Sequence, residues 1–176
     1  MVGLSEDDRW HQLNAVFGAK AVPARTHLAA ALNLLFGIRC QAITQMKVSD
    51  VAHFGDLVHV KLGSEPLLLP EEVGLLAQSA TRDRQVRRLF GKTTDLHWLY
   101  PGASPGYPMT ADALAERVRA LGVSPSPART TALASLAMQL PAAIISRWTG
   151  LSIAAATRRA EAVAASNAEY AALRRT

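Results

Sequence analysis

Arginine side chains near the end of the sequence are its best candidates for a defined chemistry, the binding of phosphate. Residues 141–163 (PAAIISRWTGLSIAAATRRAEAV) predict a helix, a turn at Gly150 and then a second helix. This is the pattern of a helix-turn-helix, whose second helix can enter the major groove of DNA. Arg147, Arg158 and Arg159 would then contact DNA phosphates. The same pattern also arises at an ordinary corner between two helices.

Other kinds of active site find little support in the sequence. The histidines lack the paired spacing of a zinc enzyme, since they stand at positions 11, 27, 53, 59 and 97. There is no glycine-rich phosphate loop and no GxSxG serine motif. Cys40 follows Arg39 at a predicted helix start, where a reactive thiolate is possible but a small buried side chain is more common. We therefore expect no metal and no cofactor.

The positive charge is concentrated in the second part of the chain. Residues 1–81 hold 6 Lys/Arg and 8 Asp/Glu, whereas residues 82–176 hold 13 and 6. The net charge of +5 thus combines −2 with +7. Such asymmetry favours an oriented surface for a polyanion. A solvated helical surface rich in arginine would give the same counts.

The composition indicates one helical domain with a sizeable core. The 176 residues are 49% hydrophobic and 6% aromatic, and alanine dominates, so we expect closely packed helices. The single cysteine excludes an internal disulfide framework. No apolar run is long enough to predict a membrane span, and residues 1–9 have no apolar signal segment. We expect a soluble, cytoplasmic protein in which residues 1–176 form a single domain.

Hydrophobic periodicity predicts the elements that must position the arginines. Helical patterns cover most of the chain, and the spacing changes to period two only at residues 57–69, which predicts one antiparallel hairpin. The predicted fold class is therefore mainly α with a small antiparallel β-hairpin. Four smaller predictions concern a helix end at residues 49–51, a short strand at 98–100, a loop at 124–127 and a new helix cap at Asn167.

The order of these segments resembles the catalytic domain of the tyrosine recombinases, or phage integrases. Residues 32–51 (LNLLFGIRCQAITQMKVSDV) are similar to that family's first arginine motif, with Gly37 and Arg39 at matching positions. The hairpin carries Lys61 near the position of a lysine in that family. Further similar segments follow in the family's order at residues 97–108, 110–123, 128–134 (ARTTALA), 148–152 (WTGLS) and 156–160 (ATRRA).

The resemblance implies a phosphate site built on Arg39 and Arg129, with Lys61 as a group that handles protons. In this family two arginines hold the phosphate at which a DNA strand is cut. Their planar guanidinium groups suit that role because charge develops on the phosphate oxygens in the transition state. The resemblance covers about residues 24–165, so it implies the fold of the whole domain.

Departures from the family pattern fall on the groups that cut the strand. The tyrosine that attacks the phosphate is replaced by Ala160, and two histidine positions hold Ser126 and Leu151. Alanine has no oxygen with which to form a phosphotyrosine link, and leucine cannot donate a proton. Tyr170 is the only tyrosine downstream, and an exposed helix residue is a more common role for it than that of a displaced nucleophile. The implied domain keeps its shape and loses its cleavage chemistry.

These patterns lead to four hypotheses for function. The first is a degenerate tyrosine-recombinase catalytic domain related to DNA recombination and integration, which is used to bind double-stranded DNA or is a relic of a mobile element. The second is a helix-turn-helix regulator or replication-associated protein built on residues 141–163. A helical protein-interaction module and an active recombinase that uses Tyr170 rank lower. The candidate DNA contacts are Arg39, Lys61, Arg129, Arg147, Arg158 and Arg159.

The family's N-terminal core-binding domain has no counterpart before residue 20. We therefore expect either a lone C-terminal domain or a fragment of a longer protein. In that family the N-terminal domain completes a clamp around DNA. A homo-oligomer is the alternative to a missing N-terminal domain. Without a second half of the clamp, affinity for DNA should be modest and should depend strongly on salt.

Overall fold

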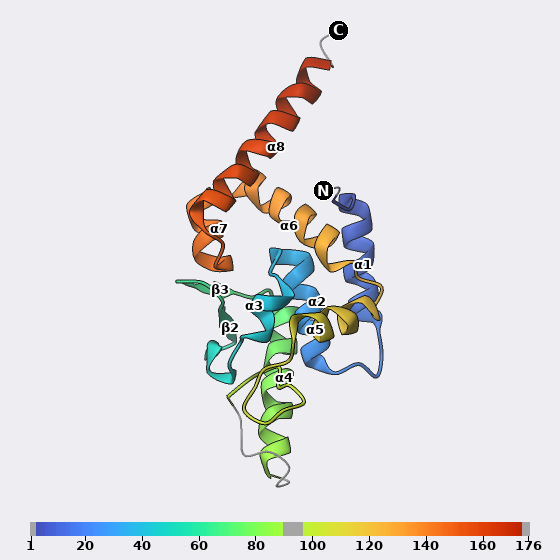
Figure 1. Ribbon diagram of the computed structural model, residues 1–176, viewed down its shortest axis with the longest axis vertical. Coiled ribbons are helices and arrows are strands. Elements are labelled where there is room, and N and C mark those ends of the chain that lie inside the picture. Colours follow the sequence, from blue (N-terminus) through green and yellow to red (C-terminus); the bar gives the residue numbers. More distant parts are fainter. Residues whose placement is uncertain (1–2, 90–96, 174–176) are drawn as a thin grey trace.

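The helix α2 (Ala24–Phe36) lies at the centre of the fold (Figure 1). The computed structural model describes residues 3–89 and 97–173. Eight of the 13 residues of α2 are buried, and three of them form an alanine run whose small side chains let neighbouring helices approach closely. Four helices pack against α2: α1 (Glu6–Gly18), α4 (Glu71–Leu89), α5 (Ala111–Arg119) and α6 (Pro125–Gln139).

The other elements lie around this centre. They are α3 (Cys40–Thr44), the 3-10 helix η1 (Val48–Asp50), β1 (Val51–Phe54), β2 (Leu57–Lys61), β3 (Pro66–Leu68), α7 (Ala142–Thr149) and α8 (Ile153–Leu173). The first part of α8 packs against α6 and α7, and the helix then extends away from the rest of the molecule (Figure 1). No described helix is both long enough and apolar enough to cross a membrane.

The three strands form one antiparallel sheet in the order β1–β2–β3. Val60 in β2 pairs with Val51 of β1 and with Leu67 of β3, and all three side chains are buried. The sheet packs against α4, where a Cβ atom placed on Gly74 would lie 3.2 Å from Cβ of Val58. The missing side chain at this glycine therefore lets α4 lie close to β2.

The predicted fold class is confirmed, but the hairpin has a third strand. β1 occupies residues 51–54, where the sequence predicted the end of a helix. Phe54 pairs with Leu57, so Gly55 and Asp56 form a two-residue turn, and Gly55 has φ +62°. A glycine at the first position of such a turn supplies the positive φ that the connection needs. This Gly-Asp pair was a hairpin signal that the prediction missed.

Three further predictions of local structure were wrong. Residues 98–100 form no strand, and Trp98 makes only an isolated bridge to Lys47. The loop predicted at 124–127 is the first turn of α6, where proline is tolerated because the first N–H groups of a helix have no partner within it. No new helix begins at Asn167, since α8 continues to Leu173.

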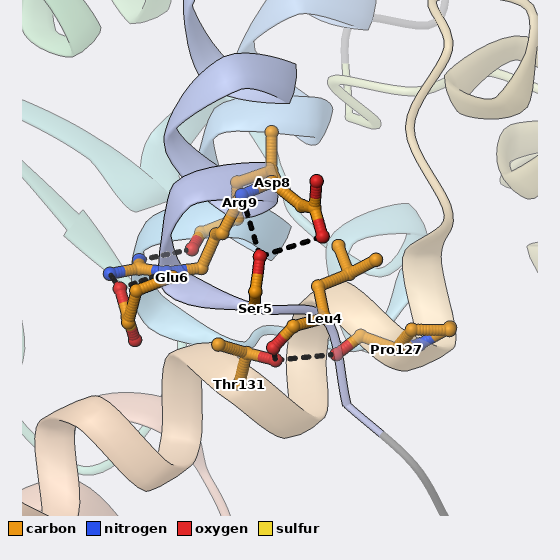
Figure 2. Close-up of polar contacts among 8 residues, drawn as sticks. Leu4, Ser5, Glu6, Asp8, Arg9, Pro127 and Thr131 are labelled. Atoms are coloured by element: carbon orange, nitrogen blue, oxygen red, sulfur yellow. Dashed lines mark hydrogen bonds and ion pairs between the residues drawn. The ribbon is translucent and has the colours of Figure 1, made fainter.

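The N-terminal segment is fastened to the start of α1 and to α6 (Figure 2). The Ser5 hydroxyl accepts a hydrogen bond from the N–H of Asp8 at 3.0 Å, which caps α1 as the sequence predicts. The Thr131 hydroxyl donates to the carbonyl of Leu4 at 2.7 Å. Arg9 is buried and its guanidinium donates to the Leu34 carbonyl at 2.8 Å, so α1 also contacts the end of α2.

The end of α2 meets α6 at Gly37. This residue has φ +63°, and a Cβ atom placed on it would lie 2.5 Å from Cγ of Leu133 and 3.1 Å from the carbonyl oxygen of Arg129. Both the backbone conformation and the lack of space therefore require glycine here.

We predict that Gly37→Ala lowers the free energy of unfolding by about 2–4 kcal/mol. A left-handed alanine costs about 1 kcal/mol, and forcing a methyl group into a packed contact adds about 1–3 kcal/mol. Gly122→Ala is the matched control, because Gly122 has φ +80° but an added Cβ would meet nothing within 4 Å. Urea denaturation of both variants measures the difference. Equal losses for the two would contradict the close contact between α2 and α6.

Candidate nucleic-acid interface

Arg39 lies on a rigid corner between α2 and α3. Gly37 ends α2 in the left-handed conformation, and the N–H of Ile38 donates to the carbonyl of Leu32 at 3.3 Å. The side-chain amide of Asn33 donates to the Ile38 carbonyl at 2.9 Å. Asn33 is 1% exposed, so this bond is shielded from water. The corner thus fixes the backbone before Arg39, whose side chain is exposed.

Arg129 approaches the same corner from α6. Its carbonyl oxygen faces Gly37, two residues before Arg39 in the chain. Its guanidinium group is partly buried, and the Nε atom has no hydrogen-bond partner among the residues that the structure describes. A buried N–H group without an acceptor is costly. Arg129 therefore lacks an acceptor of the kind that a phosphate oxygen provides.

Arg159 reaches this region from α8. A small apolar cluster of Leu133, Ile145 and Ala156 joins α6, α7 and α8. Arg159 lies one helical turn beyond Ala156 and so shares its face of the helix, and it is half-buried. The adjacent Arg158 is exposed, and its Nε donates to a carbonyl of its own helix at 3.3 Å. The two neighbouring arginines therefore have different surroundings.

The charges of Arg39 and Arg159 both act on Arg129, and we call these three residues the arginine cluster. Burial, followed by the charges of Arg159 and Arg39, lowers the pKa of Arg129 to about 10. The group is still protonated at pH 7, so the cluster is cationic there. Within residues 3–89 and 97–173, no carboxylate forms an ion pair with any of the three. A bound anion would relieve their repulsion.

Lys61 lies at the end of β2 and is exposed. The described structure shows no hydrogen bond or ion pair between Lys61 and the arginine cluster. The turn after it docks on the end of α7, where the N–H of Glu65 donates to the Arg147 carbonyl at 3.2 Å. A Cβ atom on Gly63 would overlap that same carbonyl, so only glycine permits this approach. The hairpin turn is therefore held against α7.

Arg147 is joined to this turn and not to the arginine cluster. Its guanidinium forms an ion pair with the Glu65 carboxylate at 3.1 Å, and both side chains are about half exposed. An exposed pair of this kind contributes at most about 1 kcal/mol to stability. It would separate at low cost if a phosphate group approached Arg147.

The three positions that depart from the recombinase pattern lie in α6, just after α7 and in α8. Ser126 is exposed in the first turn of α6, and Leu151 packs on the apolar cluster beneath α8. Ala160 follows Arg159 in α8 and is half-buried. A methyl group therefore stands beside the third arginine of the cluster.

Tyr170 lies in the same helix as Ala160, ten residues further along. Ten helical residues span about 15 Å, and this part of α8 leads away from the rest of the molecule (Figure 1).

Sequence reasoning missed two residues that shape this region. Asn33 fixes the corner before Arg39, and its place in the last turn of a helix that ends at glycine was the available signal. Burial raises the pKa of the Cys40 thiol. The charge of Arg119, on α5, lies near enough to Cys40 to oppose part of this rise. No local sequence pattern predicts that Arg119 lies near Cys40. Cys40 is half-buried, in keeping with a packing role.

A polar hollow is lined by residues other than the arginine cluster. It has a volume of about 330 Å³ and is lined by His53, Gln78, Thr81 and Arg82, from β1 and α4. None of the arginines predicted from the sequence lines it. The described part of the chain has no cluster of three or more His, Cys, Asp or Glu side chains that could hold a metal ion.

Comparisons with known proteins identify relatives of the fold but no close relative in sequence. No protein-family model and no curated protein matches the chain. Three similar solved structures are recombinases. The structure of XerA recombinase has a TM-score of 0.64 at 19% identity and aligns with 91% of this chain and 60% of its own.

The other two structures show XerH site-specific recombinase with difH DNA. The post-cleavage complex on palindromic difH has a TM-score of 0.69 at 13% identity, covering 99% of this chain and 54% of XerH. The pre-cleavage complex has a TM-score of 0.65 at 13% identity, covering 90% and 50%. The chain therefore spans 50–60% of the length of these proteins. Its fold is that of a tyrosine recombinase catalytic domain, as the resemblance in sequence implied.

Proposed function

We propose that this chain binds double-stranded DNA through the arginine cluster and does not cut it. The observation that carries the proposal is that α6 brings Arg129 to the corner before Arg39 and packs on the face of α8 that holds Arg159. In the described structure no carboxylate forms an ion pair with any of the three arginines. Arg129 also has a buried Nε without an acceptor. A DNA phosphate supplies both the negative charge and the acceptor oxygens that this arrangement lacks.

Three further cations extend the proposed contact surface. Lys61, Arg147 and Arg158 are exposed. Lys61 precedes the docked hairpin turn, Arg147 pairs with Glu65 of that turn, and Arg158 precedes Arg159 in α8. Contacts of this kind bind the DNA backbone without reading its sequence. The XerH structures hold that recombinase on its difH substrate, which supports DNA as the partner here.

The proposed loss of cleavage follows from the residues around the cluster. Attack on a phosphodiester needs a nucleophilic oxygen in line with the phosphorus and a group that protonates the departing oxygen. Ala160 has no such oxygen, and Leu151 has no proton to give. The cluster would hold the phosphate while the barrier to attack stays high. We place this function in DNA recombination or integration, as a domain kept for binding.

A helix-turn-helix regulator is the second candidate. Its supporting observation is the exposed start of α8, where Ser152, Ile153 and Ala154 all face solvent. In this arrangement α8 would enter the major groove with Arg158 on a phosphate. It predicts that binding depends on DNA sequence and on Arg158 more than on Arg129.

We predict that the protein binds duplex DNA at low salt and loses affinity steeply as salt rises. Six phosphate contacts would give about a thousandfold loss between 50 and 200 mM salt, because each contact releases counterions. Arg129→Ala should weaken binding about tenfold at low salt and lower the salt slope by about 0.9. Fluorescence anisotropy with a labelled duplex across a salt series measures both quantities.

Arg82→Ala is the matched control for this measurement. It removes the same charge from an exposed position on α4, and Figure 1 shows α4 and α8 extending in opposite directions from the centre of the molecule. The slope should stay unchanged in this variant. If the wild-type protein fails to bind at low salt, or if the two variants behave alike, the arginine cluster is not a DNA site.

We predict that the protein forms no covalent link to DNA. A duplex nicked near the bound site traps the phosphotyrosine intermediate of a recombinase, because the cut fragment diffuses away. Under conditions in which anisotropy shows the duplex to be bound, denaturing gels should show no protein–DNA adduct. An adduct that disappears in Tyr170→Phe would show that Tyr170 acts as the nucleophile and would overturn the proposed loss of cleavage.

A further inference from the structure

The position of Arg159 gives the cluster a charge that exceeds the charge of one backbone phosphate. Ala156, one turn earlier in α8, is 1% exposed and packs with Leu133 of α6. Arg159 is half-buried and shares the face of α8 that packs on α6, the helix of Arg129, while Arg158 stays exposed. The cluster therefore carries three positive charges that no described carboxylate offsets through an ion pair.

An internal phosphate of DNA matches this charge poorly. A phosphodiester carries one negative charge and has two oxygens outside the sugar linkages. A phosphate monoester at a strand end carries between 1.5 and 2 negative charges at about pH 7 and has three such oxygens. The extra charge interacts with every guanidinium in the cluster, and the extra oxygen offers an acceptor to the buried Nε of Arg129.

We propose that the arginine cluster prefers the terminal phosphate of a DNA strand to an internal phosphate, and that Arg159 sets this preference. The proposal rests on the DNA-binding function proposed above and narrows it to phosphorylated ends or nicks. Arg39 and Arg129 bind either kind of phosphate. Arg159 contributes the third charge, which a monoester uses more fully than a diester does.

Binding to short duplexes of one sequence tests the preference. One duplex carries phosphates at its 5′ ends, one carries them at its 3′ ends, and one has hydroxyl groups at all ends. In low salt at about pH 7.5, the wild-type protein should bind at least one phosphorylated duplex about tenfold more tightly than the hydroxyl duplex. Anisotropy competition gives the ratio directly.

Arg159→Gln should reduce this ratio to about twofold or less, because the third charge is gone. Arg158→Gln is the matched control, since it removes the same charge from the next residue of α8. It should weaken all three duplexes equally and leave the ratio unchanged. An equal fall of the ratio in both variants would show that net charge alone, and not the position of Arg159, sets the preference.

Inorganic phosphate distinguishes a DNA end from a free anion as the ligand. In millimolar excess it should lower the ratio toward one, while at concentrations near that of the duplex it should have no effect. Displacement at those low concentrations would show that free phosphate is the ligand and would overturn the assignment to DNA ends. Equal binding of all three duplexes by the wild-type protein would overturn the end preference alone, whereas no binding to any duplex would also overturn the proposed DNA-binding function.

Discussion

The close approach of α6 to the end of α2 is the contact on which the candidate site depends. Gly37 allows it, because a hydrogen atom in place of a side chain leaves room for Leu133 and for the backbone of Arg129. The left-handed conformation of the same glycine turns the chain toward Arg39. One residue thus sets both the direction of the corner and its distance from α6. The buried amide of Asn33 makes that corner stiff.

The arginine cluster is unfavourable for the stability of the unliganded protein. Three like charges repel one another, and partial burial adds a desolvation cost that falls mainly on Arg129. Apolar packing offsets this cost, because Leu133, Ile145 and Ala156 hold α8 against α6 despite the repulsion among the arginines. A surface built only for stability would place an acidic side chain among the three arginines. The described structure has no such ion pair there.

The sequence predicted most of the elements because their signals are local. Ser5 and Thr110 cap helices as expected, and Gly37 and Gly150 end them in the left-handed conformation. The hairpin followed from its period-two spacing. β1 was missed because four residues are too few to show a period, although the Gly-Asp turn marked its end. Local signals of this kind do not depend on the tertiary packing of the helices.

The site was predictable only in part, because its geometry depends on contacts between distant segments. The resemblance to recombinases indicated Arg39 and Arg129 as a pair. It gave no role to Arg159, which entered through the separate helix-turn-helix hypothesis. Arg159 acts on Arg129 because α8 packs on α6. The pairing of Arg147 with Glu65 likewise joins positions 82 residues apart, and no motif connects them.

The separation of 82 residues between Glu65 and Arg147 affects the order in which contacts form during folding. The turn of the hairpin meets the α7–α8 corner backbone to backbone, at Gly63 and Gly150. Closing so long a loop costs more chain entropy than forming the hairpin itself, so this contact forms after the local ones. During synthesis from the N-terminus the strands of the sheet are made before the partner of its turn. The last helices complete the packing of a sheet whose strands precede them by about eighty residues.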